Sequence, residues 1–216
     1  MNVMRKVIAS INISLDNYMS GPNCELDWHF EKWGPDLAES FSKQLSHADT
    51  ILLGRITYCA MARYWPQQAQ DLDYPREDIA FAHMMNVYTK VVFSNTLTHL
   101  PWMNSKLLKG NLKKEILKLK KQAGKDIIIY GSAKLISSMV ELGLIDEYVL
   151  YVHPVILGSG KPLFKNSADT LNMKLIKTQS FRTGVVMLCY RTELPMKESL
   201  SSPSIHSEYH CAPSQN

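Results

Sequence analysis

Residues 127–134 read IIIYGSAK, an isoleucine run that ends at Gly131 and leads into a segment with helical spacing. A strand without a polar face is typical of a sheet that is covered on both sides, because neither face meets solvent. The same order of apolar strand, small or hydroxyl residue and helical segment occurs at 51–57 (ILLGRIT) and begins again at 91–95 (VVFSN). The sequence therefore predicts an α/β fold with a mostly parallel sheet.

The segments around these three complete the predicted layout. Residues 6–13 alternate as in a strand, and residues 14–17 (SLDN) have the composition of a turn. Helical spacing covers 35–48, a helix from 55, 79–87, 112–124 and 133–142, and further strands are expected at 148–155, 171–181 and 185–191. Because the last three strands follow one another without helices, we expect an antiparallel edge with a hairpin turn at 182–184.

Length and composition fit one globular domain. The chain has 216 residues, of which 45% are hydrophobic and 20% are charged, and its formal net charge is +4. We expect one domain over 1–193 and a disordered tail over 194–216, where Ser, Pro and polar residues leave little to bury. The small net charge does not indicate nucleic acid, lysines between 106 and 125 are expected on the solvated face of a helix, and no apolar run is long enough to span a membrane.

Neither the cysteines nor the tail histidines indicate a metal site. No C-x-x-C pair occurs among the four cysteines, which are Cys24, Cys59, Cys189 and Cys211. This scatter argues against a disulfide scaffold and a zinc ribbon, and it favours a reducing cytoplasm. In the tail, His206, His210 and Cys211 have metal-like spacing but lack a fourth ligand, so no bound metal is expected.

The three strand-to-helix turns favour binding of an anion. At the carboxyl edge of a parallel sheet, the first turn of a helix presents free N–H groups and a positive dipole. Gly54 permits close approach of a phosphate, and Thr57 adds a hydroxyl. Arg55 opposes the helix dipole by about 0.3–1 kcal/mol, which suggests a negative partner. Each turn taken alone also fits an ordinary N-cap, and neither a G-x-G-x-x-G motif nor a P-loop lysine occurs.

These turns carry a resemblance to a known family. Gly54-Arg55-x-Thr57, Ser94 and Gly131-Ser132 resemble the cofactor-contacting turns of dihydrofolate reductases. Residues 14–21 (SLDNYMSG), 142–147 (LGLIDE) and 154–164 (PVILGSGKPLF) are similar to the branch that contains the reductase domain of riboflavin biosynthesis. The resemblance covers residues 3–192. It implies the three-layer α/β fold of dihydrofolate reductase, with a mostly parallel central sheet and antiparallel C-terminal strands.

The resemblance also implies an NADPH-dependent reductase of a small heterocyclic or ribose-linked molecule, with hydride transfer to C=N or C=O. By this resemblance, Gly54, Arg55 and Thr57 hold the pyrophosphate side of the cofactor. Ser94 and Asn95 lie near its adenosine ribose or 2′-phosphate. Gly131, Ser132 and Ala133 lie near its pyrophosphate and nicotinamide. Asn95 stands at a position where a basic residue would give a firmer basis for expecting NADPH rather than NADH. The branch often forms homodimers through its C-terminal strands, and we expect a homodimer here.

Two carboxylates are candidates for the proton donor that accompanies hydride transfer. Asp16 lies on the turn after the first strand, where its alternative role is that of an Asx-turn residue. Asp36 opens a helix, as does the substrate-binding carboxylate of dihydrofolate reductases, although Asp is also an ordinary partner of the helix dipole. Aromatic residues that could wall a substrate pocket or belong to the core are Trp28, Trp33, Tyr64 and Trp65. His153 is expected to be a satisfied core or interface histidine.

Two alternatives remain open at this stage. A true dihydrofolate reductase requires Asp36 to face the pocket beside the nicotinamide site. A non-catalytic nucleotide-binding or stress-related protein would keep the fold and bind the cofactor without a proton donor directed at the nicotinamide.

Overall fold

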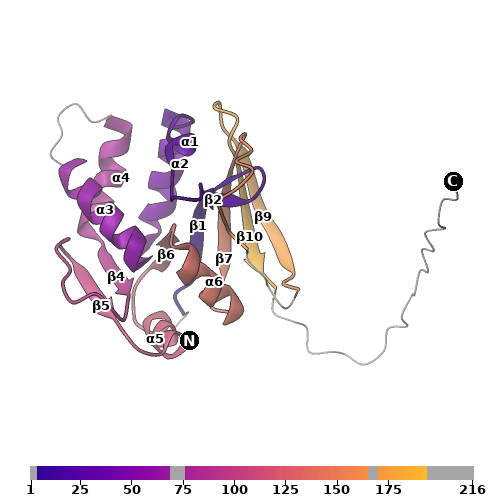
Figure 1. Cartoon of the computed structure of the whole chain (residues 1–216). Helices are drawn as coiled ribbons and strands as arrows, with labels where there is room; N and C mark the ends of the chain where they lie inside the picture. The colour runs from indigo at the N-terminus through magenta and orange to yellow at the C-terminus, as the bar shows by residue number, and fades with distance from the viewer. Residues whose placement is uncertain (1–3, 69–75, 165–169, 194–216) are drawn as a thin grey trace, which may run out of the picture.

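An eight-stranded mixed sheet forms the centre of the molecule (Figure 1). The structure is a computed structural model that describes residues 4–68, 76–164 and 170–193. The strand order is β5-β4-β3-β6-β1-β7-β10-β9, and the strands are β1 (Val7–Ser14), β3 (Ala48–Gly54), β4 (Thr89–Phe93), β5 (Ser105–Leu108), β6 (Asp126–Tyr130), β7 (Glu147–His153), β9 (Met173–Ser180) and β10 (Val186–Thr192). From β5 to β7 all neighbours are parallel, whereas β10 is antiparallel to both β7 and β9. The predicted α/β class and its antiparallel C-terminal edge are confirmed.

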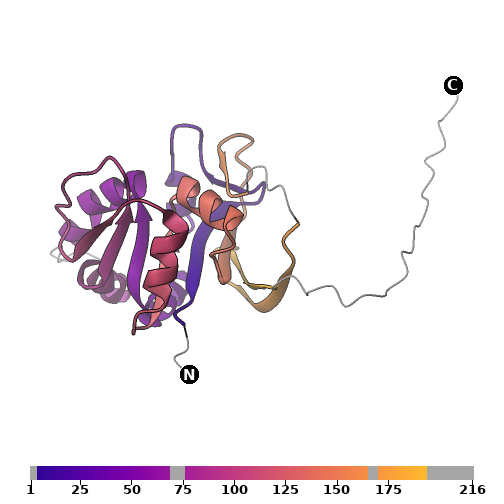
Figure 2. The same cartoon turned by 90° about the horizontal axis from the view of Figure 1, so that it is seen from below.

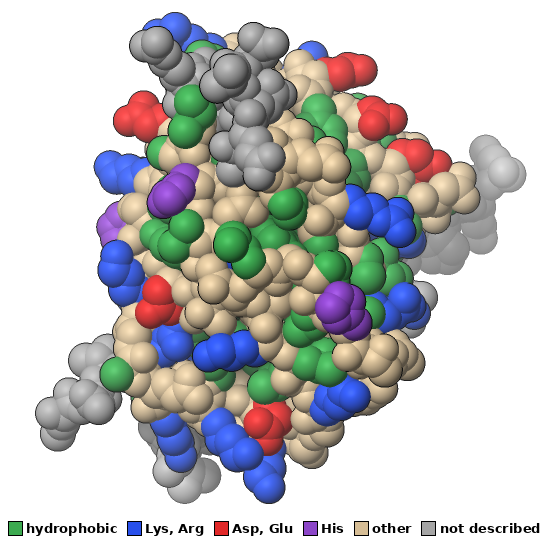
Figure 3. Space-filling view, turned by 90° about the vertical axis from the view of Figure 1, so that its left-hand side faces the viewer, with side chains coloured by type: hydrophobic (Ala, Val, Ile, Leu, Met, Phe, Trp, Pro, Cys, Tyr) green, Lys and Arg blue, Asp and Glu red, His purple; other side chains and the backbone are tan. Residues whose placement is uncertain are grey.

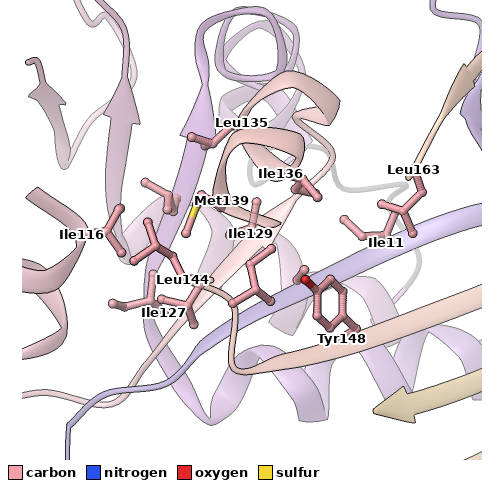
Figure 4. Close-up of a cluster of buried hydrophobic side chains, with 14 of the residues drawn as sticks. Ile11, Ile116, Ile127, Ile129, Leu135, Ile136, Met139, Leu144, Tyr148 and Leu163 are labelled. Carbon is pink, nitrogen blue, oxygen red and sulfur yellow. The ribbon is translucent and has the colours of Figure 1, made fainter. Parts of the chain in front are cut away.

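Helices cover both faces of this sheet (Figures 1 and 2). One face packs against α2 (Pro35–Ser46), α3 (Arg55–Gln68) and α4 (Arg76–Val87), and the other against α5 (Leu112–Lys120) and α6 (Ala133–Glu141). Figure 4 shows the second interface, where Leu135, Ile136 and Met139 of α6 lie over Ile127 and Ile129 of β6. This burial of one apolar stripe per helix against a two-sided apolar sheet stabilises the three layers.

Several element boundaries differ from the sequence-based expectation. The helix expected over 35–48 ends at Ser46, and Ala48 begins β3 instead. The helix expected over 112–124 ends at Lys120, and that lysine is 7% exposed rather than solvated. The short elements β5 and α1 (Asp27–Phe30) were not predicted, because neither has enough residues to show a period. Lysines between 106 and 125 therefore belong to a strand, a loop and a helix.

The surface over α3, α4 and β5 is mixed in character (Figure 3). Its hydrophobic side chains occur in small scattered groups between Lys, Arg, Asp and Glu side chains. Within the described ranges, no helix is long and apolar enough to cross a membrane. The tail predicted at 194–216 lies outside the described residues, so the boundary at residue 193 stays a prediction.

A small second sheet explains part of the C-terminal sequence signature. β2 (Tyr18–Ser20) pairs antiparallel with β8 (Lys161–Pro162), and Leu163 donates its N–H to the Asn17 carbonyl at 3.1 Å. A β-carbon at Gly160 would clash with the carbonyl oxygen of Ser20. The backbones approach so closely here that only glycine fits.

We expect Gly160→Ala to lower the free energy of unfolding by about 2 kcal/mol, because the added methyl pushes β8 away from β2. Gly158→Ala is the matched control: Gly158 has φ +72, and a β-carbon added there would have no described atom within 4 Å, so the cost is the left-handed backbone alone. That cost is about 1 kcal/mol. Urea unfolding of both variants measures the difference, and equal losses would contradict the packing explanation.

Candidate functional site

Two strand-to-helix turns lie side by side at the carboxyl edge of the sheet. β3 and β6 are parallel neighbours with Leu52 opposite Ile129, and α3 and α6 begin directly after them. The Gly54 N–H donates to Ser132 Oγ at 2.9 Å, and the Ser132 N–H donates to Thr57 Oγ1 at 3.0 Å. These reciprocal hydrogen bonds couple the two turns into one rigid unit.

The hydroxyl of Ser132 serves this coupling rather than the helix that follows it. Ser132 occupies the N-cap of α6 with φ 64 and ψ 48, and its hydroxyl donates to the Tyr130 carbonyl at 3.2 Å. Its side chain makes no capping hydrogen bond to α6. The first N–H groups of α6 therefore keep their donor capacity for an external acceptor.

The backbone at Gly131 keeps this turn narrow. Gly131 has φ +54, and a β-carbon there would lie 3.2 Å from Thr57 Cγ2. A side chain at this position would push the α3 turn away from the α6 turn. Glycine thus lets the two helix starts stay in contact.

The electrostatics at both helix starts favour an anion. The first turns of α3 and α6, both within the described part of the chain, contain no acidic residue. Arg55 begins α3 and is exposed, and Lys134, also exposed, follows the half-buried Ala133 in α6. Two helix dipoles and two cations therefore present positive potential at one place, where a diphosphate would be stabilised.

The third predicted turn lies on the next strand, at the end of β4. Gly54 is opposite Phe93 in register, so Ser94 and Asn95 follow directly beside the α3 turn. Ser94 is buried, and its hydroxyl accepts the N–H groups of Thr96 at 3.2 Å and Leu97 at 3.1 Å. The Ser94 hydroxyl thus stabilises its own turn. Asn95 is exposed, and its Oδ1 accepts the Gly110 N–H at 3.3 Å.

Asp16 is held by three donors on the turn after β1. Its Oδ1 accepts from Ser14 Oγ at 2.6 Å and from the Leu157 N–H at 3.1 Å, while its Oδ2 accepts from the Gly158 N–H at 2.7 Å. The hydrogen bond from Ser14, followed by those from Leu157 and Gly158, lowers the pKa of the Asp16 carboxyl. This geometry favours the turn role for Asp16, because a carboxylate held in its ionised form has no proton to give.

Asp36 joins the start of α2 to the β9–β10 hairpin. Its Oδ2 accepts the N–H of Arg182 at 2.9 Å, and its Oδ1 accepts the N–H of Leu37 at 3.0 Å. The side chain is half-buried at the same edge of the sheet as the three turns. Each carboxylate oxygen still has a lone pair that a substrate N–H could use.

The aromatic candidates divide between the core and the edge of the sheet. Trp33 lies 5.2 Å from Phe41, which stacks on Tyr151 at 4.1 Å with an interplanar angle of 18°. Trp65 packs edge-on against Phe81, and Tyr64 is 44% exposed. Trp28 instead packs on His153 at the end of β7. Trp33 and Trp65 thus contribute to the core under α2 and α4.

A polar group at the ends of β1 and β7 was not predicted from the sequence. His153 Nε2 lies 2.9 Å from Asn12 Oδ1, and His29 of α1 lies beside His153 with ring centroids 6.0 Å apart. The expected satisfied histidine is satisfied at one nitrogen only, because its Nδ1 has no partner among the described residues. A signal does exist in the sequence, since Asn12 is a carboxamide in a strand whose other polar residues are the small Ser10 and Ser14.

Metal binding has no support in the described part of the chain. No group of three or more His, Cys, Asp or Glu side chains is arranged there to hold an ion. His206, His210 and Cys211 lie outside the described residues.

Known proteins share both the sequence and the fold. A family model described as the RibD C-terminal domain matches residues 5–187. The uncharacterized protein YyaP of Bacillus subtilis (strain 168) is 37% identical over 186 residues, which is 86% of this chain and 94% of that protein. This family match confirms the predicted resemblance.

Two solved structures show how widely the fold is shared. A putative riboflavin biosynthesis protein from Shewanella sp. PV-4 has a TM-score of 0.67 at 24% identity, covering 88% of this chain and 99% of that one. The dihydrofolate reductase of Enterococcus faecalis, in complex with NADP(H), has a TM-score of 0.56 at 11% identity, covering 87% of this chain and 96% of that one. At these identities the likeness establishes the fold alone.

Proposed function

Because this chain belongs to the RibD C-terminal domain family, we propose that it is an NADPH-dependent reductase of a small heterocyclic or ribose-linked molecule. The reaction in this proposal is hydride transfer to a C=N or C=O group, as in the reductase step of riboflavin biosynthesis.

The observation that carries the proposal is the coupled pair of turns at Gly54–Thr57 and Gly131–Ala133. The hydrogen bonds between Gly54, Ser132 and Thr57 fix two helix starts beside each other, and the hydroxyl that could have capped α6 is used between the turns. Uncapped N–H groups, two helix dipoles and the exposed Arg55 are the donor set that a pyrophosphate requires. The residues present therefore fit a dinucleotide, and the solved dihydrofolate reductase with NADP(H) supports that choice.

Each residue has a definite task in this proposal. Bound NADPH would supply the hydride. Arg55 and the first N–H groups of α6 would hold the pyrophosphate, and Gly131 would let the backbone approach the cofactor closely. Asn95 would face the adenosine ribose or its 2′-phosphate with the amide nitrogen that its bond to Gly110 leaves available. Positioning of this kind is the main contribution that a protein makes to hydride transfer.

For the proton, we propose Asp36 rather than Asp16 as the carboxylate that contacts the substrate. Asp16 accepts three hydrogen bonds and its pKa is lowered, so it stabilises the loop that contains Leu157 and Gly158. Asp36 lies on a helix end and has a lone pair on each oxygen in addition to its two hydrogen bonds. One of these lone pairs can take a proton from water and pass it to the substrate nitrogen or oxygen as the hydride reaches carbon, which leaves Asp36 ionised as before.

Calorimetric titration with NADPH and NADH tests the proposal on the full chain. We expect NADPH to bind more tightly than NADH, and Arg55→Ala to weaken NADPH binding by about 1.5–3 kcal/mol through loss of a charge-assisted phosphate contact. Arg63→Ala is the matched control, because Arg63 is exposed two turns further along α3.

The possible results separate three parts of the assignment. An unchanged dissociation constant in Arg55→Ala would remove Arg55 from the site. A preference for NADH would contradict the role given to Asn95. Failure to bind either nucleotide would contradict the proposed function as a whole.

Assembly into a homodimer through the C-terminal strands is also part of the proposal. β9 is the edge of the eight-stranded sheet, and it exposes Leu175 by 50% and Ile176 by 42%. Apolar side chains on an unpaired edge strand are a hazard for a monomer, and burial against a second copy removes it.

One observation favours a second candidate, a nucleotide-binding protein without turnover. The carboxylate nearest to the end of β1, Asp16, is committed to three donors and lacks a proton to transfer. If Asp36 also proves dispensable, binding without reduction becomes the better description. A true dihydrofolate reductase is the remaining alternative, and activity on dihydrofolate would identify it.

A further inference from the structure

A pair of buried histidines lies where the segment 21–33 crosses the ends of β1 and β7. His153 is opposite Ser14 in register and is 1% exposed, and His29 of α1 is 9% exposed. The Trp28 ring packs edge-on against both imidazoles, with centroid distances of 5.2 Å to each. The two histidine rings are themselves 6.0 Å apart.

Both rings are incompletely hydrogen-bonded. A carboxamide oxygen only accepts, so the 2.9 Å contact to Asn12 Oδ1 requires His153 to carry a proton on Nε2. The Nδ1 of neutral His153 is then a bare acceptor, and it is buried with no partner in the described part of the chain. The Nδ1 of His29 is buried and unpartnered in the same way. Such groups are unusual in a stable core and reduce the stability of the contact that they form.

Ring packing is the main attachment of this segment to β7, while nearer its two ends Cys24 Sγ contacts Lys161 Nζ of β8 and Trp33 packs on Phe41 of α2. Backbone hydrogen bonds that start within it stay local, from Gly21 to Glu25, from His29 to Leu26 and from Trp33 to Phe30. The Trp28 indole also donates within the segment, to the Glu25 carbonyl at 3.3 Å. Toward β7, the segment contacts the sheet through Trp28 and His29 against His153.

We propose that residues 21–33 form a strap that is released from the ends of β1 and β7 when His29 and His153 become protonated. Two cations with ring centroids 6.0 Å apart would repel each other inside an apolar contact. The strap lies over the strand that leads into the Asp16 turn, so its release opens the same edge of the sheet that the proposed active site occupies.

The direction of the pH effect follows from burial. Desolvation lowers the pKa of His29 to about 4, and desolvation together with His29 lowers the pKa of His153 to about 4. Charged groups on the strap are Glu25, Asp27, Glu31 and Lys32, and those on the neighbouring elements are Asp16 after β1 and Asp36 at the start of α2. None of these is a cause of either lowered pKa, whereas the neighbouring histidine is.

The released strap binds protons that the closed strap excludes. Closure is therefore fully favourable above the ordinary histidine pKa of 6.5 and is lost as the pH falls toward 4. With these two values, the closing equilibrium constant falls by roughly twenty-fold per histidine between pH 7 and pH 5.

Hydrogen exchange of the full ligand-free chain tests the strap. After correction for the intrinsic exchange rate, we expect peptides within 21–33 to lose protection by roughly twenty-fold or more from pH 7 to pH 5, while peptides from β6 stay protected. The double variant His29→Gln, His153→Gln should lose this pH dependence. His47→Gln should retain it, because His47 is exposed at the end of α2.

Three results would overturn the proposal. The first is strap protection that does not change with pH in the unmodified protein. The second is equal loss of protection in the strap and in β6, which would indicate global unfolding. The third is an ordinary pKa for either buried ring in an NMR titration of the histidines, a measurement that needs no variant to fold. None of these measurements requires a bound nucleotide, so the outcome is independent of the proposed function.

Discussion

Replacement of Asp146 by alanine is expected to lower the free energy of unfolding by about 3 kcal/mol, because it strands a buried ammonium group. Lys120 is 7% exposed, and its Nζ donates to both Asp146 oxygens at 2.8 and 2.7 Å. The same carboxylate accepts the Val7 N–H at 2.7 Å, and the Asp146 N–H donates back to the Val7 carbonyl at 2.9 Å. For a chain of this length, the loss corresponds to a fall of roughly 10 °C in Tm.

Two further variants distinguish the loss of stability caused by an unpaired buried charge from the loss caused by removing an exposed ion pair. Glu115→Ala removes the Glu115–Lys118 pair, whose lysine side chain is 58% exposed, and we expect a change below about 0.5 kcal/mol. Adding Lys120→Met to Asp146→Ala should restore much of the lost stability, since the unpaired charge is then absent. Thermal unfolding of the four proteins decides the question. A small loss in Asp146→Ala, or no recovery in the double variant, would contradict this explanation.

Asp146 also explains why the LGLIDE segment resembles a family signature. Its backbone carbonyl accepts the Thr192 N–H at 3.1 Å, so one residue connects the start of β1, the end of α5 and the end of β10. The signature that identifies the family is therefore structural at this position. Gly160 in the second part of the signature has a structural reason as well, because β2 and β8 leave no room for a side chain there.

The elements that the sequence predicts well are those whose pattern extends over several turns or a full strand. β6 contacts the hydrophobic core under α2 on one face and the core under α6 on the other, so residues 127–130 are apolar on both faces. This uninterrupted apolar run makes the strand easy to predict from the sequence. β5 is a four-residue edge strand with a lysine in its middle, and its place depends on backbone pairing with β4 that no local pattern reveals. Lys120 shows the same limit, since only the approach of Asp146 makes its burial favourable.

The sequence predicts where the candidate site lies, but it does not predict which hydrogen bonds the residues of the site form. Small and hydroxyl residues after β3, β4 and β6 point to one edge, because parallel strands end together. Which partner each hydroxyl chooses depends on tertiary distance: Ser132 bonds the α3 turn, whereas Ser94 bonds its own loop. The pairing of His153 with Asn12 joins residues that are 141 apart in the chain, so it could not be predicted from spacing.

Asp36→Asn is expected to reduce kcat by about 10²–10⁴-fold while leaving NADPH affinity unchanged, if this carboxylate assists proton transfer as proposed. We expect kcat to fall without a change in NADPH affinity because Asp36 is on α2, whereas the turns proposed to bind the nucleotide precede α3 and α6. The assay is NADPH oxidation with the pterin or pyrimidine compound that the unmodified protein reduces, together with titration of NADPH into both proteins.

Glu39→Gln is the matched control for this experiment, because Glu39 is exposed on the same helix and has no assigned role. The Asp36 variant must also be compared by Tm, since Asp36 accepts the Arg182 N–H and holds the β9–β10 hairpin to α2. Asparagine keeps one carbonyl oxygen, so the hairpin contact survives in one rotamer and only the acidic function is lost. Unchanged kcat would exclude Asp36 from the chemistry. Since Asp16 is already held as an ionised acceptor, the proton would then have to come from water or from the substrate itself.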